Sequence, residues 1–202
     1  VLLRYAIAII SLSAIGHFVP EVMGLGTGTV LGAVSGEYVL YFALIILIGK
    51  ILATSISLGL GFFGGVFSPA LLVGASAGSV VAELFVLVGF LEKFEPALVV
   101  SGMAAVTGAV IGAPLCMVVI VMELTSSYIY ALSSLVGLTL SVSLSHILFG
   151  ASYFDRQLGT RGIDISTGRS GMFLMEKRAA DYASLDYIKL YCHDSVEDAS
   201  RL

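Results

Sequence analysis

The sequence contains little charge. Only 12% of its 202 residues are Asp, Glu, Lys or Arg, whereas soluble globular chains average about 25%. Hydrophobic residues reach 58%, and the mean hydropathy is +1.03. Of the 24 charged residues, nine fall in residues 1–152 and fifteen in the last fifty. These proportions exclude a soluble globular domain. They predict an all-α membrane protein, a bundle of tilted and partly discontinuous helices with a short polar tail.

Basic residues and cysteines are also too few for several common kinds of site. The net charge is −4, and no basic stripe supports nucleic-acid binding. Cys116 lies in an apolar segment and Cys192 in the tail, so the two form neither a disulfide framework nor a metal-ligand spacing. We find no nucleophile–base pair. We therefore expect no enzymatic activity and no cofactor.

The apolar residues form long runs separated by breaks. A helix rises about 1.5 Å per residue, so about 20 residues cross a bilayer. The runs cover residues 2–19, 38–58, 69–90 and 129–149. Lys50 lies inside the second run, and an ionisable residue there indicates a function by default. The alternative is that Lys50 snorkels, or that a tilted helix places it near an interface.

Two stretches predict irregular structure inside the membrane. Pro20 ends the first run, and residues 21–37 are rich in glycine, which predicts a loop with a short re-entrant helix. The string Gly24-Leu-Gly-Thr-Gly28 follows no strand, which excludes a dinucleotide fingerprint. Further on, residues 97–111 and 115–124 are two half-length apolar helices joined by Gly112-Ala-Pro114. Discontinuous pairs of this kind are typical of channels and secondary transporters.

Residues 64–72 are the strongest functional candidate. Gly59, Gly61, Gly64 and Gly65 precede Ser68, which we expect to be an N-cap, and Pro69, which suits a first helical turn. Such a loop can aim unpaired N–H groups at one point, with the helix dipole behind them. Irregular backbone survives in a membrane only when it is buried in protein or lines a cavity. The stretch therefore predicts an anion site.

From Asp155 onward the sequence is rich in charged residues. Arg156, Arg161, Arg169, Lys177 and Arg178 follow the last span closely, which predicts a cytoplasmic tail by the positive-inside tendency. Residues 187–192 have the pattern of a short strand, and His193-Asp-Ser195 that of a turn and helix cap. We expect a soluble domain to begin there and to be cut off, and we interpret Val1, inside an apolar run, as a cut edge as well.

Four motifs resemble those of the CLC family of chloride channels and chloride/proton exchangers. Gly65-Val66-Phe67-Ser68-Pro69 matches the family's G-x-F-x-P motif. Gly112-Ala-Pro-Leu to Glu123-Leu-Thr125 resembles its "A-P-L … E-[LM]-T" helix, and Pro20 to Gly24 its P-x-x-x-G loop. Tyr153 resembles the tyrosine that closes the family's central anion site. The similarity runs in order over residues 1–162.

The resemblance implies a site, a substrate and an assembly. The amides of Val66 and Phe67, within a loop formed by Gly65, Ser68 and Pro69, would coordinate a dehydrated chloride or similar small anion. The Tyr153 hydroxyl would donate to the same ion from the cytoplasmic side. Protons are a second expected substrate in an exchanger. Residues 115–124 and 129–149 would contribute to a homodimer interface in the lipid bilayer.

The chain also departs from the family pattern. The G-S-G-I-P loop and the G-[KR]-E-G-P loop, which complete and gate the anion site in the family, do not occur. We therefore expect residues 1–152 to be the second of two inverted repeats, truncated at its N-terminus. Residues 153–186 would be a cytoplasmic helix and linker, and residues 187–202 the start of a truncated CBS-like regulatory domain.

Other interpretations remain at this stage. An unrelated secondary transporter with broken helices is the main alternative, and a substrate-sized cavity lined with charged side chains near residues 64–69 would favour it. Tyr153 could be an interfacial tyrosine, the commoner role at the end of a span. Glu123 could carry protons, but at the end of a short helix we expect it to bond neighbouring backbone.

Overall fold

The computed structural model describes residues 2–62, 64–89 and 94–160, and these residues form helices and no strands. The elements are α1 (Leu2–Phe18), the 3₁₀ helix η1 (Pro20–Val22), α2 (Thr27–Val34), α3 (Leu40–Gly59), α4 (Phe67–Leu87), α5 (Glu95–Ile111), α6 (Pro114–Thr125), α7 (Tyr128–Phe149) and α8 (Tyr153–Thr160). Residues 1–157 form one compact unit, and 158–202 a second, of which only residues 158–160 are described. The predicted all-α class is confirmed.

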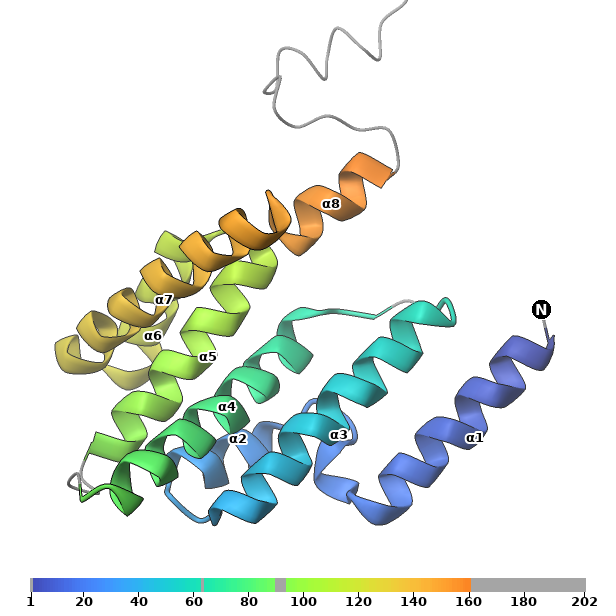
Figure 1. The fold of residues 1–202 in the computed structure, drawn as a ribbon, viewed down its shortest axis with the longest axis horizontal. Coiled ribbons are helices and arrows are strands. Elements are labelled where there is room, and N and C mark those ends of the chain that lie inside the picture. The colour runs from blue at the N-terminus through green and yellow to red at the C-terminus, as the bar shows by residue number, and fades with distance from the viewer. Residues whose placement is uncertain (1, 63, 90–93, 161–202) are drawn as a thin grey trace, which may run out of the picture. The chain divides into compact units, whose positions relative to one another are not determined.

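Helix α4 lies at the centre of the first unit (Figure 1). It packs against α3 on one side and against α5 on the other, and the short helix α2 contacts both α4 and α5. Helix α1 extends the layer beyond α3, while α6 and α7 pack together against α5. Figure 1 shows α3 and α4 running in opposite directions, so that an extended connection brings the chain back to the start of α4.

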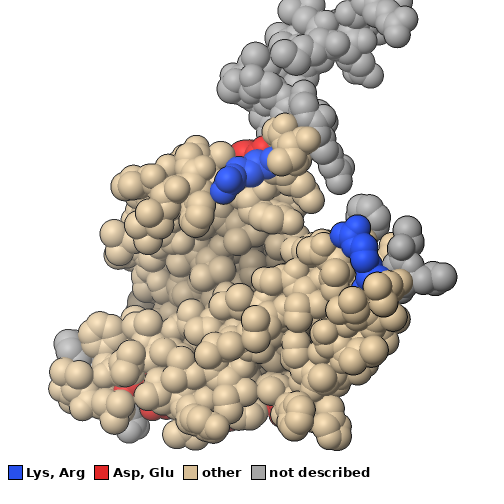
Figure 2. All heavy atoms as spheres, turned by 45° about the vertical axis from the view of Figure 1, so that its right-hand side comes forward, with Lys and Arg blue, Asp and Glu red and all other residues tan. Residues whose placement is uncertain are grey.

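Three helical segments are long and apolar enough to cross a membrane: Leu40–Gly59, Phe67–Leu87 and the run Tyr128–Thr160, which contains α7 and α8. The face in Figure 2 carries almost no charge, as a surface in contact with lipid requires. The first predicted run forms the apolar helix α1, which is shorter than these three segments within the described residues. Helix α1 ends at Phe18, because the residue before Pro20 disfavours helical backbone.

Small residues let α4 and α5 approach closely. A Cβ at Gly74 would lie 2.5 Å from the carbonyl oxygen of Gly102, and one at Gly78 would lie 2.6 Å from Cα of Val99. Backbone packs on backbone here, so neither position has room for a side chain. This contact fixes α4, and with it the start of α4, against the rest of the bundle.

The discontinuous helix pair is confirmed. Gly112 ends α5 in the left-handed region, at φ +78°, and its amide donates to the Gly108 carbonyl at 2.9 Å. Pro114 then opens α6, where its missing N–H removes no intrahelical bond. The first half begins at Glu95, two residues before the predicted start, because Glu95 and Pro96 suit a first helical turn.

Serines of α7 bond to backbone carbonyls, whereas Glu123 does not behave as predicted. The hydroxyls of Ser133 and Ser134 donate back to the Tyr130 carbonyl, and Ser101 of α5 donates across to the Ser133 carbonyl at 3.0 Å. Glu123 is exposed and forms no hydrogen bond within the described part of the chain. The expectation that it bonds neighbouring backbone is therefore wrong, because its carboxylate lies on the outer surface of α6.

Part of the predicted organisation lies outside the described residues. Of the linker expected over residues 153–186, the structure describes only α8. The strand predicted at 187–192, the following cap and the CBS-like domain start all fall in residues 161–202, which are not described. The domain boundaries beyond α8 thus stay predictions.

The close contact between α4 and α5 predicts a stability difference between two Gly→Ala substitutions. A Cβ at Gly102 would lie 2.5 Å from the Gly74 carbonyl oxygen, so Gly102→Ala should destabilise the full-length protein by about 1–3 kcal/mol. Gly59→Ala is the matched control, because nothing lies within 4 Å of a Cβ there. Thermal unfolding in detergent should show a lower midpoint for Gly102→Ala alone, and equal midpoints would refute the packing argument.

Candidate anion-binding site

Helix α4 begins two residues earlier than predicted from Ser68 as the N-cap. Val66 is the N-cap residue, Phe67 the first helical residue and Pro69 the third. Pro69 therefore lies in the first turn, as predicted. The prediction that Ser68 caps the helix is wrong. Its hydroxyl instead donates to the Leu25 carbonyl at 2.6 Å, because the loop before α2 lies against the start of α4.

The amides at this helix start have no internal partner. The first helical bond is from the Ala70 amide to the Val66 carbonyl, at 3.0 Å. Pro69 has no N–H. The amides of Val66, Phe67 and Ser68 thus remain, and within the described residues none of them donates to a carbonyl. Three unpaired donors at the positive end of a 21-residue helix favour an anion.

The glycines before α4 differ in their backbone conformation and in the space beside them. Gly61 has φ +92°, in the left-handed region that favours glycine, whereas Gly64 and Gly65 do not. A Cβ on Gly59, Gly64 or Gly65 would meet nothing within 4 Å. Gly61 is thus a position in this loop where the backbone conformation itself favours glycine. At Gly64 and Gly65 the missing side chain leaves open space beside the loop.

A cavity of about 210 Å³ lies beside this loop. Its lining includes Gly64, Gly65, Val66 and Pro69, together with Lys50 of α3. Lys50 is only 5% exposed, and its ammonium donates to the carbonyls of Val22 at 2.7 Å and Gly24 at 3.0 Å. The interpretation of Lys50 as a snorkelling residue is therefore wrong, since its ammonium is buried against backbone carbonyls. Its placement near a membrane interface stays a prediction.

Tyr153 is the first residue of α8, and a capping box holds it in place. The Ser152 hydroxyl donates to the Asp155 carboxylate at 2.7 Å, the Ser152 amide donates to the same oxygen, and the Asp155 amide donates to the Ser152 hydroxyl at 3.2 Å. Ser152 also lies against the α5–α6 break, where a Cβ at Gly112 would come within 2.8 Å of its hydroxyl. The break thus fixes the start of α8.

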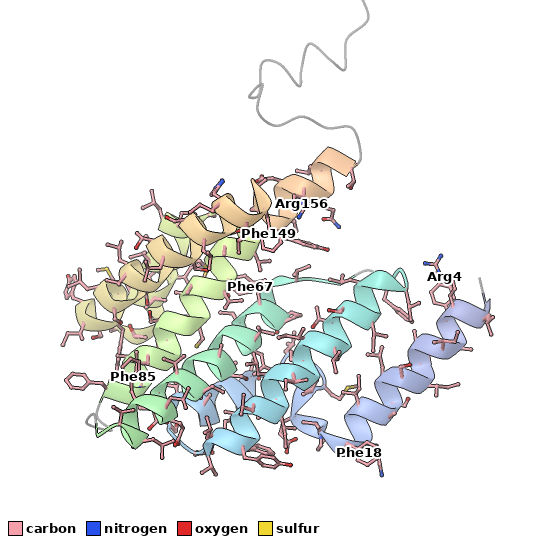
Figure 3. The ribbon with its side chains drawn as sticks, in the orientation of Figure 1. Arg4, Phe18, Phe67, Phe85, Phe149 and Arg156 are labelled. Carbon is pink, nitrogen blue, oxygen red and sulfur yellow. The ribbon has the colours of Figure 1, made fainter. Side chains whose placement is uncertain are left out.

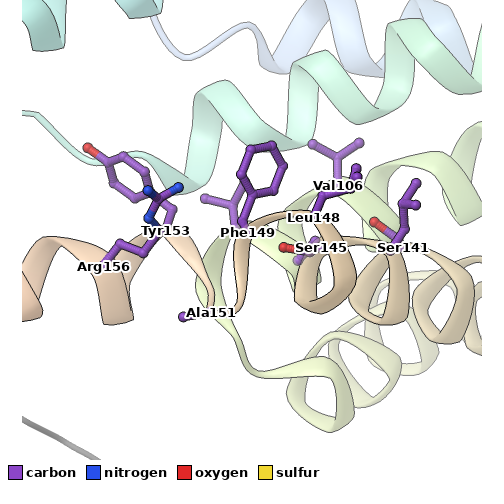
Figure 4. Close-up of a pocket in the computed structure, with 11 residues that line it drawn as sticks. Val106, Ser141, Ser145, Leu148, Phe149, Ala151, Tyr153 and Arg156 are labelled. Atoms are coloured by element: carbon purple, nitrogen blue, oxygen red, sulfur yellow. The ribbon is translucent and has the colours of Figure 1, made fainter.

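Tyr153 lines a second cavity, of about 410 Å³, between α5, α7 and α8 (Figure 4). The ring of Tyr153 is 37% exposed and packs edge-on against Phe154, with 5.7 Å between ring centroids. Arg156 lines the same cavity, with its guanidinium carbon 5.8 Å from the ring centroid of Phe149. A phenol and a guanidinium therefore share one mostly apolar cavity.

The predicted ligands come from two elements, the start of α4 and the start of α8. Figure 3 draws Phe67 at the start of α4 and Phe149 near the end of α7, which precedes Tyr153. The two cavities have no lining residue in common, since the loop before α4 lines one and Tyr153 the other. A shared ion between the Val66 and Phe67 amides and the Tyr153 hydroxyl therefore stays a prediction.

Two features near the site were missed from the sequence. Arg156 follows Tyr153 by three residues, a spacing that places both on one face of a helix and could have been noticed. The pattern Ser152-x-x-Asp155 has the spacing of a capping box. By contrast, no sequence signal connects Lys50 or Ser68 to the carbonyls of residues 22–25, because those contacts join segments 26 to 43 residues apart.

Comparison with known proteins agrees with the motifs. Residues 1–146 match the family model of the voltage gated chloride channel. The H(+)/Cl(−) exchange transporter ClcA of Vibrio parahaemolyticus is 26% identical over 70% of this chain and 30% of its own length. A putative chloride channel protein, ClcB-like, of Ralstonia nicotianae is 29% identical over 77% of this chain and 37% of its own.

An uncharacterized protein of Methanocaldococcus jannaschii is 35% identical over 52% of this chain and 25% of its own length. The chain thus spans about a quarter to two fifths of the length of these relatives. The family match excludes the alternative interpretation that the chain is an unrelated secondary transporter with broken helices. By its helices, its motifs and this match, the chain belongs to the CLC family of voltage-gated chloride channels and transporters.

Proposed function

We propose that this chain forms one side of a chloride pathway in a CLC channel or chloride/proton antiporter. The observation that carries the proposal is the set of three amides at Val66, Phe67 and Ser68, which have no hydrogen-bond partner in the part of the chain that the structure describes and which lie in a bundle of apolar helices. A helix N-terminus with free donors attracts an anion. Membrane interiors tolerate such unpaired backbone only where it lines a cavity or is buried in protein.

Uncharged donors suit the transport of chloride. A pathway must bind its ion well enough to remove water from it and weakly enough to release it. Amide dipoles meet this requirement better than a full positive charge at contact distance would. No Lys or Arg occurs between Lys50 and Lys93, so the segment that forms the start of α4 is free of cationic side chains.

Tyr153 supplies the donor on the opposite side in this proposal. Its hydroxyl belongs to a residue held by the Ser152–Asp155 capping box, which favours a fixed position. Gly65, Ser68 and Pro69 shape the loop around the ion without contributing a charge. The gating loops of the family are absent from this sequence, so the proposal covers the amides and the tyrosine only.

The outer faces of α6 and α7 suit a homodimer interface in the membrane. Their exposed side chains are large and apolar, as a surface in contact with lipid or with a second copy requires. They include Leu115, Val119, Leu124, Ile129 and Leu132. Each subunit would then hold its own anion pathway, because the amides of α4 lie on the other side of α5.

The distribution of charge favours a cytoplasmic position for α8. Figure 3 places Arg4 and Arg156 toward the same end of the first unit, and the Arg4 guanidinium donates to the Gly59 carbonyl at the end of α3 at 3.5 Å. Glu21, Glu37 and Glu95 lie in segments at the opposite ends of α1, α3 and α5. Basic residues gather on the cytoplasmic side of membrane proteins.

The amide site predicts the outcome of a charge introduced at Val66. Val66→Asp places a carboxylate next to the proposed ion and should abolish chloride flux from liposomes that contain the full-length protein. Val66→Asn is the matched control, because asparagine has nearly the same shape as aspartate and carries no charge. This variant should keep a measurable share of the chloride flux. Unchanged flux in Val66→Asp would rule out the proposed site.

The tyrosine predicts a loss of anion binding. Tyr153→Ala removes one hydrogen bond to a charged ligand, worth about 1.5–3 kcal/mol, so the chloride dissociation constant measured by calorimetry should rise about tenfold or more. In an exchanger, the ratio of chloride to protons carried should change as well. Tyr128→Ala is the control, because Tyr128 is an exposed tyrosine at the start of α7. Equal effects of the two variants would make Tyr153 an interfacial residue only.

A further inference from the structure

The loop between α1 and α2 is held by side chains from three helices. The Thr29 hydroxyl of α2 donates to the Glu21 carbonyl at 3.0 Å. The Lys50 ammonium of α3 donates to the Val22 and Gly24 carbonyls, and the Ser68 hydroxyl of α4 to the Leu25 carbonyl. We refer to residues 21–25 as the carbonyl loop, because four of its five carbonyls accept these bonds.

The carbonyl loop is anchored in the bundle at Val22. Lys50 is the eleventh of the twenty residues of α3, so its partners lie beside the middle of a helix long enough to span a membrane. Val22 is 1% exposed and packs with Ile46 and Leu72 in one apolar cluster. An unpaired carbonyl at a buried residue costs several kcal/mol. The Lys50 ammonium removes that cost at Val22, through a buried hydrogen bond of 2.7 Å.

The same loop touches the start of α4 at two points. Ser68, the second residue of α4, donates to the Leu25 carbonyl. One turn further, Leu72 packs with Val22 of the loop, and also against Gly26, the residue that follows the loop, where a Cβ would come within 2.6 Å of the Leu72 Cδ2 atom. The position of the first turn of α4 therefore depends on the carbonyl loop as well as on the extended connection from α3.

We propose that Lys50 is a positioning residue for the anion site at the start of α4. It fixes the carbonyl loop, the loop fixes Ser68 and Leu72, and these fix the amides of Val66 and Phe67. This inference rests on the proposed function, since it assigns Lys50 to the same site. A lysine suits the role because its long apolar stem reaches from α3 and its ammonium offers three donors, of which two bind the loop.

The charge of Lys50 contributes at a distance. Lys50 lines the cavity of about 210 Å³ that Gly64, Gly65 and Val66 also line. Its ammonium is bound to two carbonyl dipoles, which offset its charge only in part. A positive potential therefore extends toward the loop before α4, while the contact donors remain neutral amides. This arrangement draws an anion to the site without holding it by an ion pair.

The test is a double-mutant cycle in the full-length protein. Lys50→Met keeps the length of the side chain and removes its donors and charge, and Ser68→Ala removes the hydroxyl bond to Leu25. Chloride flux per reconstituted protein should fall at least tenfold in Lys50→Met and several-fold in Ser68→Ala. If both act through the carbonyl loop, the double variant should be no worse than Lys50→Met alone.

Two further variants separate positioning from a general effect on folding. Ser76→Ala is the matched control for Ser68→Ala, because the Ser76 hydroxyl is buried in the same helix and donates only to the Leu72 carbonyl, at 2.9 Å. It should leave the flux unchanged. Lys50→Arg, which can still donate to two carbonyls, should keep more flux than Lys50→Met. The chloride dissociation constant, which a loss of folded protein alone does not move, should rise with the loss of flux.

The possible outcomes are distinct. Wild-type flux and wild-type chloride affinity in Lys50→Met would overturn the inference while leaving the proposed function in place. Fully additive effects of Lys50→Met and Ser68→Ala would also overturn it, because the two residues would then act separately. If Lys50→Met does not assemble, the chloride flux and chloride affinity of Ser68→Ala still test the inference. A wild-type protein that carries no chloride would overturn the proposed function, and the inference with it.

Discussion

The structure depends on one constraint, the need of every backbone polar group inside a membrane bundle for a partner. This chain meets the constraint differently for acceptors and donors. Four of the five carbonyls of residues 21–25 are bound by Thr29, Lys50 and Ser68 from three helices. The amides at Val66 to Ser68 have no partner among the described residues. These four acceptors are thus satisfied within the bundle, and in the proposed function the three donors bind an external anion.

The rigid parts of the fold hold both sides of the candidate site. Glycines at 74, 78 and 102 bring the backbones of α4 and α5 into contact, which leaves the start of α4 little freedom to shift. The break at Gly112 contacts Ser152, and the Ser152–Asp155 box sets the first turn of α8. Two breaks in the helical pattern, one before α4 and one after α5, therefore place the amides and Tyr153 on fixed elements.

Cationic side chains lie around these elements rather than at the amides. Lys50 is bound to carbonyls beside the loop that precedes α4, and Arg156 lies on the cavity that Tyr153 lines, against the ring of Phe149. A charge at contact distance binds an anion strongly and slows its release, whereas a charge held further away raises the local anion concentration. In the proposed function, this arrangement would favour passage of the ion rather than its retention.

The sequence by itself determined the helical membrane class, the discontinuous pair around Gly112 and the break before the helix that contains Pro69, because hydropathy, Gly and Pro act locally. Only the tertiary structure decided what Lys50 and Ser68 bind. Ser68 has the local pattern of an N-cap, but a carbonyl 43 residues away competes for its hydroxyl. In the sequence, Lys50 is a charged residue inside an apolar run. Its partners in the structure are backbone carbonyls, and the pattern of side chains in the sequence does not predict them.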